Sequence, residues 1–224
     1  MSLSKVIELA RDELGYTENP PGSNRTKYWE AYDPKMQGQP WCVAFLWWVF
    51  QKAGERMAFF GGGKTASCGT LLMWYQNMEQ TVPVSEVQPG DIVILNFHGT
   101  QDTEHCGLVV DVPARGLTNN LDFYTIEGNT SSGVWGSQDN GGCVAEKLRH
   151  TYQIVAVCRP QYQPEIVDDI TGRWSEVDVR WCIENGLMEG YPDGSWKPKQ
   201  DVTREELAVV LRRFYRRFME DDGK

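Results

Sequence analysis

Cys42 is the residue in this chain whose surroundings most favour nucleophilic chemistry. It follows Pro40 at the start of an almost wholly apolar run, residues 41–50, that stops before Gly54. Proline before the run and glycine after it predict a helix, and apolar residues on every side predict that the helix is buried. Unpaired N–H groups and the positive end of the dipole at a helix start lower the pKa of a thiol, and the thiolate attacks carbonyl carbon. The competing interpretation is a small core residue.

Three further polar residues give Cys42 a set of candidate partners. His105, one of three histidines, opens a segment whose residues 108–112 are predicted to form a buried strand. Glu127 and Asn129 follow a second β-rich segment, and a period of two places both on one face of a strand. A thiol, an imidazole and an orienting carboxylate or amide are the components of nucleophilic cysteine catalysis. Taken singly, they are also explained as a strand-end histidine, a solvated charge and a turn residue.

Four short stretches of sequence, in this order along the chain, resemble the CHAP domain, the cysteine- and histidine-dependent amidohydrolases/peptidases that cut peptidoglycan. They are residues 39–45, 87–93, 104–109 and 126–129, and the resemblance extends over residues 1–162. It implies a papain-like fold in which Cys42 is the nucleophile, His105 the base, and Glu127 and Asn129 the groups that orient the histidine. The implied activity is that of an N-acetylmuramoyl-L-alanine amidase or an endopeptidase of the stem or cross-bridge.

The sequence around Cys42 also bears on metals and substrate. Some relatives bind calcium through an aspartate-rich loop before the cysteine, but residues 34–40 carry no acidic side chain and only Asp33 precedes them. Since calcium needs six or more oxygen ligands, we expect no metal and no cofactor. Gln37 or Gln39 is expected to add a donor to the oxyanion hole that the Cys42 N–H begins, and Gln39 and Trp41 are candidate substrate contacts.

A second module is predicted after a polar, acidic linker at residues 163–169. A helix is predicted from Trp174 to about residue 185, then a turn at residues 191–194, then a helix that starts at the capping box of Thr203 and Glu206. Residues 184–198 and 202–206 resemble one S-layer homology (SLH) repeat, a module that holds secreted proteins to secondary cell-wall polysaccharide, and this resemblance assigns residues 170–224 to the module. Such repeats commonly work in threes, so we expect self-association, as a trimer, with Trp174 and Arg204 at the glycan site.

The order of the predicted elements indicates the fold class. Apolar helices come first, at residues 41–50 and 68–76, and about five strands follow, at residues 82–97, 107–112, 123–127, 142–148 and 154–159. Because strands and helices do not alternate, we expect an α+β fold with helices packed on an antiparallel sheet, not a doubly wound α/β fold.

Composition narrows the function classes. A formal net charge of −9 argues against nucleic-acid binding. The six cysteines lack CxxC or zinc-type spacing, so neither a disulfide scaffold nor a zinc site is expected. The amino terminus is amphipathic, unlike a signal peptide, and no segment is long enough to span a membrane. The resemblance then implies a phage endolysin made in the cytoplasm and released through a holin. The alternatives are a non-catalytic wall-binding or phage structural protein and a cysteine peptidase that acts on protein.

Overall fold

The computed structural model describes residues 3–113, 122–133, 136–162, 169–191 and 194–219. The chain divides into two compact units, Met1–Gln163 and Pro164–Lys224, and each is described by itself.

Four α-helices are found in the first unit: α1 (Leu3–Asp12), α2 (Lys27–Tyr32), α3 (Cys42–Lys52) and α4 (Cys68–Asn77). The helix predicted at residues 41–50 is α3, and eight of its eleven residues are buried, as its uniformly apolar sequence predicts. Helix α4 begins where Ser67 accepts a hydrogen bond from the Thr70 N–H. In α3 the residue at the same position, Trp41, provides no side-chain acceptor. The first N–H groups of α3 therefore receive no side-chain cap from it.

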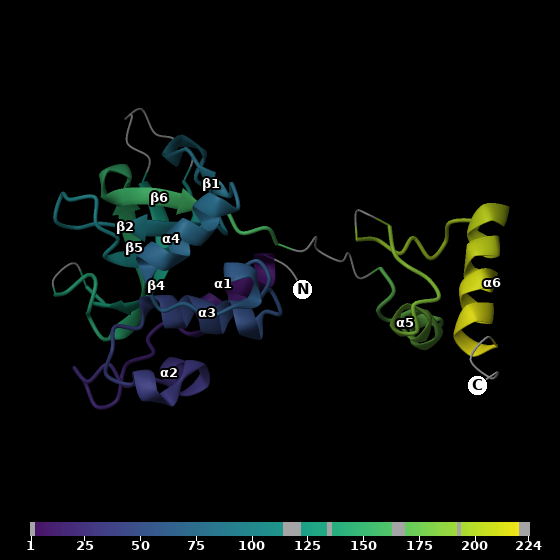
Figure 1. Ribbon diagram of the computed structural model, residues 1–224, viewed down its shortest axis with the longest axis horizontal. Helices are drawn as coiled ribbons and strands as arrows, with labels where there is room; N and C mark the ends of the chain where they lie inside the picture. Colours follow the sequence, from purple (N-terminus) through teal and green to yellow (C-terminus); the bar gives the residue numbers. More distant parts are fainter. Residues whose placement is uncertain (1–2, 114–121, 134–135, 163–168, 192–193, 220–224) are drawn as a thin grey trace. The chain divides into compact units, whose positions relative to one another are not determined.

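A six-stranded antiparallel sheet completes the first unit, which confirms the α+β prediction (Figure 1). The strand order is β1-β6-β2-β3-β4-β5. The strands are β1 (Thr81–Val82), β2 (Ile92–Leu95), β3 (His105–Asp111), β4 (Asp122–Thr130), β5 (Cys143–His150) and β6 (Ile154–Cys158). The single strand predicted at residues 82–97 is wrong. It is divided into β1 and β2, because Pro83 and the turn at Pro89-Gly90 interrupt pairing.

Alternate residues of the strands face two different cores. Ile94, Cys106, Leu108 and Ile126 join the larger core, which also contains α3 and α4. Their neighbours on the opposite face, among them Val93 and Val109, join a smaller core. Cys42 begins a helix of the larger core, whereas His105 begins the central strand β3, so the predicted thiol and imidazole come from the helical layer and from the sheet.

The second unit contains α5 (Glu176–Glu184) and α6 (Arg204–Phe218). The predicted capping box is confirmed: Thr203 Oγ1 accepts from the Glu206 N–H at 3.1 Å, and Glu206 accepts from the Thr203 N–H at 2.8 Å. Asp169 accepts hydrogen bonds from the N–H groups of Trp196 and Lys197, at 2.9 and 2.7 Å, and so fixes the segment between the helices. Among the described residues of either unit, no helix is both long enough and apolar enough to cross a membrane.

Candidate active site

Cys42 occupies the first position of α3 and is 6% exposed. The first N–H groups of a helix have no intrahelical acceptor, and here no side chain of the preceding residue caps them. The sulfur therefore lies at the positive end of a helix dipole whose donors remain available. The same arrangement suits a thiolate and, during a reaction, a carbonyl oxygen that becomes negatively charged.

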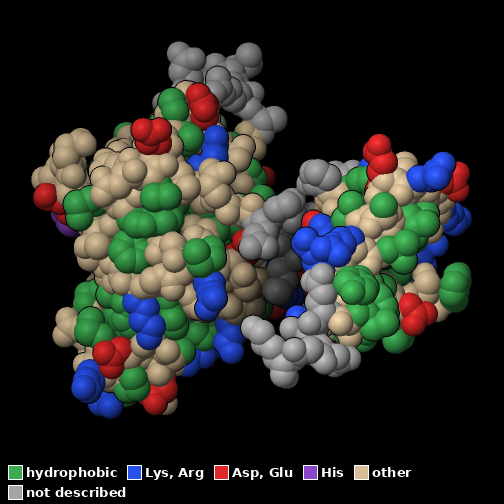
Figure 2. All heavy atoms as spheres, turned by 45° about the vertical axis from the view of Figure 1, so that its right-hand side comes forward, with side chains coloured by type: hydrophobic (Ala, Val, Ile, Leu, Met, Phe, Trp, Pro, Cys, Tyr) green, Lys and Arg blue, Asp and Glu red, His purple; other side chains and the backbone are tan. Residues whose placement is uncertain are grey.

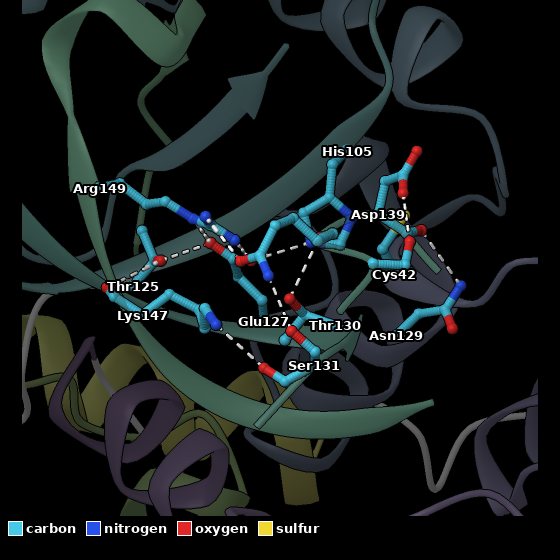
Figure 3. Close-up of polar contacts among 12 residues, drawn as sticks. Cys42, His105, Thr125, Glu127, Asn129, Thr130, Ser131, Asp139, Lys147 and Arg149 are labelled. Carbon is cyan, nitrogen blue, oxygen red and sulfur yellow. Dashed lines mark hydrogen bonds and ion pairs between the residues drawn. The ribbon is translucent and has the colours of Figure 1, made fainter. Parts of the chain in front are cut away.

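His105 is fully buried and is held from one side by Glu127 (Figure 3). Its Nε2 lies 3.0 Å from Glu127 Oε2. The other ring nitrogen, Nδ1, is buried and has no aligned hydrogen-bond partner among the described residues. Cys42 nevertheless interacts with His105 closely enough to change the pKa of both groups. The imidazole thus has one nitrogen fixed by a carboxylate and one left for proton transfer, as a general base requires.

Glu127 is fixed by three other residues besides its position on β4. Its Oε1 accepts from Arg149 Nε at 2.7 Å and from Thr125 Oγ1 at 2.6 Å, and its Oε2 accepts from Arg149 Nη2 at 2.5 Å. Arg149 comes from the neighbouring strand β5 and is itself 3% exposed. This two-point contact of a guanidinium with a carboxylate fixes both position and orientation. The result is a buried chain of polar groups, Cys42–His105–Glu127–Arg149.

The pKa values in this chain of groups favour an ion pair between thiolate and imidazolium. Hydrogen bonds from Cys106 and Cys68, with help from His105, hold the pKa of Cys42 well below its usual value against the effect of burial. Burial lowers the pKa of His105, but Cys42 and Glu127 outweigh it and raise that pKa to about 9. Burial raises the pKa of Glu127, yet Arg149 and His105 bring it down to about 2. These shifts favour the charged form of all three groups.

Two further cysteines lie beside Cys42. The sulfur atoms of Cys42, Cys68 and Cys106 all lie within 4.8 Å of one another, and Cys42 Sγ is 3.8 Å from Cys68 Sγ. A hydrogen bond with Cys106 lowers the pKa of Cys68, but contact with Cys42 and burial outweigh it and raise that pKa well above its usual value. Burial likewise raises the pKa of Cys106. The spacing of the six cysteines along the sequence gave no sign of this grouping, which tertiary packing produces.

Asn129 does not contact the histidine as predicted. A shift of strand register between Glu127 and Thr130, and a φ of 60° at Asn129, break the period of two that placed both side chains on one face. The Asn129 amide donates instead to Asn140 Oδ1 at 3.0 Å and to the Asp139 carbonyl at 3.5 Å. Asn129 therefore fixes the segment before β5, and Glu127 holds the ring of His105.

Comparison with protein families agrees with this geometry. A sequence profile of the CHAP domain matches residues 34–129, the range that contains Cys42, His105 and Glu127. The chain contains a CHAP domain. A profile of the S-layer homology domain matches residues 168–208, so an SLH domain follows the CHAP domain. Both resemblances found in the sequence are confirmed.

Two curated proteins are similar to short parts of the chain. Cell surface glycoprotein 1 of Acetivibrio thermocellus is 42% identical over 41 residues, which are 18% of this chain and 2% of that protein. Outer membrane protein SlpA of Deinococcus radiodurans is 33% identical over 57 residues, which are 25% of this chain and 5% of that protein. The chain therefore spans only a few per cent of the length of these relatives. No solved structure matches it significantly.

The two residues of the CHAP domain that were predicted to contact substrate, Trp41 and Gln39, differ in exposure. Trp41 is fully buried and stacks on Tyr28, with ring centroids 5.3 Å apart, so its ring belongs to the core and the prediction that it contacts substrate is corrected. The Gln37 amide is bonded at both ends to the backbone of Thr26. Gln39 is exposed, and its carbonyl accepts from Trp29 Nε1 at 2.8 Å. Of the two glutamines considered, Gln39 is the one whose side chain stays exposed beside the Cys42 helix.

The SLH domain has a cavity of about 540 Å³. Its walls include Tyr191, Trp196, Lys197 and Arg213, and the Lys197 ammonium lies 4.2 Å from the centre of the Tyr191 ring. Trp174 is 93% exposed and Arg204 begins α6. Neither of these predicted glycan contacts lines the cavity, so the structure separates them from the concave site of this domain.

Sequence reasoning missed Arg149, Thr125 and the neighbouring thiols. An arginine one residue before the end of a strand that mixes apolar and charged residues gives little signal by itself, because a solvated surface residue has the same pattern. Thr125 was detectable, since it lies two residues before Glu127 and must share its face of β4. Cys68 had a signal in Ser67, which marks a helix start like the one expected at Cys42.

Proposed function

We propose that this protein is a cysteine-dependent peptidoglycan hydrolase that cleaves an amide bond. The CHAP domain supports the class, that of cysteine- and histidine-dependent amidohydrolases and peptidases. The observation that carries the proposal is the buried His105, bonded through Nε2 to Glu127 and interacting with Cys42 at the start of α3. The bond is that of an N-acetylmuramoyl-L-alanine amidase or of an endopeptidase of the stem or cross-bridge.

In the proposed reaction the Cys42 thiolate forms a bond to the carbonyl carbon of the scissile amide. The oxygen becomes negative and accepts hydrogen bonds from the Cys42 N–H and, we propose, from Gln39. His105, protonated on Nδ1, donates its proton to the leaving amine as the carbon–nitrogen bond breaks, and a thioester remains. His105 then takes a proton from water, which attacks the thioester and releases the acid and the thiolate.

Glu127 keeps the ring of His105 in place through this cycle and stabilises its positive charge. Arg149 keeps Glu127 ionised and oriented. We retain Asn129 in the proposed site because its Oδ1 is buried and has no hydrogen-bond partner within the described residues. An acceptor of this kind suits an N–H group of a bound peptide.

The SLH domain is proposed to hold the enzyme to secondary cell-wall polysaccharide. Its cavity combines the rings of Tyr191 and Trp196 with two cations, Lys197 and Arg213, and four carboxylates, Glu189, Asp201, Glu205 and Glu206, and this mixture of aromatic and hydrogen-bonding groups suits a glycan. Trp174 and Arg204 stay proposed as a second part of that site, which adjacent repeats would complete. The relatives' names, a cell surface glycoprotein and an outer membrane protein, agree with a place at the cell surface.

We further propose that three copies associate through their SLH domains. The support lies in the apolar side chains that α5 and α6 leave exposed, Val177, Leu211 and Tyr215 among them (Figure 2). One repeat buries few apolar side chains. In a ring of identical copies, each repeat could cover the exposed apolar side chains of its neighbour. Light scattering on the full chain and on a chain that ends at Tyr162 tests this, and a monomer in both cases contradicts it.

Two other functions are distinguishable from this one. A non-catalytic wall-binding protein or phage structural protein would use the SLH domain alone, and a peptidase would cut protein and leave wall intact. The phage-endolysin role, with holin-dependent release from the cytoplasm, remains a prediction. An enzyme is favoured over a structural protein by the low pKa of Cys42 and the raised pKa of His105, a pairing that a structural protein does not need. Wall hydrolysis is favoured over a protein peptidase by the CHAP domain.

The decisive experiment is incubation of the purified full chain with cell-wall suspensions, followed by mass spectrometry of the soluble fragments. A free N-terminal alanine with intact glycan identifies the amidase, and a new N-terminus within the stem or bridge identifies the endopeptidase. Cys42→Ala serves as the matched inactive control. Cleavage of casein with no release of wall fragments would replace the proposal with the protein peptidase.

A further inference from the structure

Cys68 takes no covalent part in the proposed hydrolysis, and its sulfur lies 3.8 Å from that of the nucleophile. Each cysteine is the first residue of its helix, Cys42 of α3 and Cys68 of α4, and each is 6% exposed. A reactive thiol with a second thiol in contact with it is the arrangement of a nucleophile and a resolving cysteine. We propose that Cys68 is the resolving cysteine of Cys42: when hydrogen peroxide oxidises Cys42, Cys68 captures it as a reversible Cys42–Cys68 disulfide.

The chemistry balances with peroxide as the named oxidant. The Cys42 thiolate attacks one peroxide oxygen, the O–O bond breaks, and hydroxide leaves, so that the sulfur becomes a sulfenic acid. The Cys68 sulfur then attacks the Cys42 sulfur, and the sulfenic oxygen leaves as water together with the Cys68 proton. Peroxide is reduced by two electrons, and the two thiols are oxidised to one disulfide.

Position favours Cys68 over Cys106 as the resolving residue. Cys106 is fully buried and lies within β3, where it pairs with Ile94 of β2. Moving its sulfur toward Cys42 requires a shift of the central sheet. Cys68 begins a helix after the loop of residues 63–67, and the 3.8 Å between the two sulfurs must shrink to a bond of about 2 Å. A side-chain rotation and a small movement of the helix end supply that change more readily than a strand does.

The disulfide would block the proposed hydrolysis, since its nucleophile is consumed, and would preserve the enzyme. A sulfenic acid without a thiol partner is oxidised further to sulfinic acid, which thiol reductants do not reverse. The inference rests on the same Cys42 thiolate as the proposed function, but it concerns thiol chemistry that is measurable without any wall substrate.

The test exposes the full chain to hydrogen peroxide in the presence of EDTA, so that no metal ion occupies the three thiols. Peptide mapping should find a disulfide between the peptides that carry Cys42 and Cys68, and the intact mass should fall by about 2 Da, for two hydrogens lost. Dithiothreitol should restore the free thiols. Linkage of Cys42 to Cys106, or peroxide consumption with no linkage of Cys42, overturns the proposal.

Variants separate the resolving role from a merely structural one. Each variant is compared with its own untreated activity. Cys68→Ser should accumulate sulfinic acid at Cys42 and recover at least tenfold less of its activity on reduction than wild type. Cys106→Ser should still form the Cys42–Cys68 disulfide, and Cys182→Ser, in the SLH domain, should behave as wild type. Equal recovery of Cys68→Ser and wild type contradicts the proposal. If no variant or wild type cuts wall while the disulfide still forms, the proposed function fails and this inference stands.

Discussion

The CHAP unit (Met1–Gln163) and the SLH unit (Pro164–Lys224) differ in how many of their apolar side chains they bury. Of the 37 buried apolar residues described, 35 lie in the CHAP unit and two, Ile170 and Leu187, lie in the SLH unit. Among the described residues of the SLH unit, eleven large apolar side chains are exposed: Trp174, Val177, Trp181, Ile183, Val202, Leu207, Val209, Leu211, Phe214, Tyr215 and Met219. The CHAP unit therefore buries a core of its own, whereas the SLH unit leaves large apolar side chains on its surface.

The two units also differ in whether their ion pairs are buried or exposed. The Glu127 carboxylate of the CHAP unit is fully buried and has hydrogen bonds to both of its oxygens. In the SLH unit, Arg213 reaches Glu189 at 3.2 Å, but the glutamate side chain is 74% exposed. Exposed pairs contribute about 0–1 kcal/mol, while loss of one partner of a buried pair costs about 3–5 kcal/mol. Substitutions should therefore have large effects in the CHAP unit and small ones in the SLH unit.

The largest effect is expected at the nucleophile. Cys42→Ala removes the atom that forms the covalent bond, so kcat for wall hydrolysis should fall by about 10⁴-fold or more. Thermal unfolding should change little and wall pull-down should persist, since binding is assigned to the other unit. Cys182→Ser is the matched control and should retain full activity. Clearing of wall by Cys42→Ala at the wild-type rate would disprove the assignment.

Next in size are changes to the buried acid and its arginine. Glu127→Gln should lower kcat by about 10²–10⁴-fold, because the imidazolium loses its counter-charge. Arg149→Ala leaves the carboxylate buried with fewer partners and should destabilise the CHAP unit by about 3–5 kcal/mol in urea unfolding. Arg149→Lys should lie between wild type and Arg149→Ala, since one ammonium cannot replace the two-point contact.

The control for the Glu127 and Arg149 variants is an ion pair in the SLH unit. Arg213→Ala removes the exposed pair with Glu189 and should cost less than about 1 kcal/mol. A loss as large as that of Arg149→Ala would show that the two units do not differ in the way described.

Stability and activity should both depend on pH through His105 and Glu127. The folded-state pKa of His105 lies above its ordinary 6.5, so the stability it contributes is complete below pH 6.5 and is lost as pH rises through about 9. The pKa of Glu127 lies below its ordinary 4.5, so its contribution is present above pH 4.5 and is lost as pH falls through about 2.

The pH profile of kcat/KM should therefore have its alkaline limb near pH 9, where the imidazolium loses its proton. In Cys42→Ala the thiolate that helps to raise the pKa of His105 is gone, so NMR titration should find that pKa lower than in wild type. An unchanged His105 titration would show that the two side chains do not interact.

An intermediate effect on stability and activity is expected at Gly107, which lies beside Glu127. A Cβ there would meet Glu127 Cγ at 2.8 Å and Thr125 Cβ at 3.1 Å. Gly107→Ala should cost about 1–3 kcal/mol and reduce activity, because Glu127 must move. Gly69→Ala is the matched control: it is the second residue of α4, and its Cβ would approach closely only the tip of the Thr103 side chain, at 3.0 Å, which can rotate away, so its cost should be smaller.

The smallest effect is expected on the CHAP unit when the SLH unit is removed. A chain that ends at Tyr162 should keep its unfolding midpoint and its hydrolysis of soluble wall fragments, because its core is its own. Hydrolysis of intact wall should fall, because the anchor is lost. A large drop in the midpoint would show that the SLH unit contributes to the stability of the first.

The buried helix at Cys42, the fold class and both domain types could be predicted, because each depends on local signals such as Pro40 before an apolar run or the Thr203–Glu206 capping box. The contact between His105 and Glu127 could also be predicted, because the CHAP resemblance names Glu127 as a group that orients the histidine. The orientation of Asn129 was not, since a register shift of one residue reverses which face a side chain occupies and leaves no mark in composition. The grouping of Cys42, Cys68 and Cys106 joins two helices and a strand, and only tertiary packing decides it.

The place of β5 at the outer edge of the sheet gives the active site a dependence on local opening. Arg149 belongs to that outermost strand, so any fluctuation that separates β5 from β4 withdraws the guanidinium from Glu127 while the rest of the core stays folded. Edge strands open at lower free energy than central ones, and the open population lacks a fixed imidazole. The fraction of molecules able to react is then set by local opening of β5, which amide-exchange protection along residues 143–150 should report. Mutations that strengthen this edge should raise turnover at elevated temperature without touching the nucleophile.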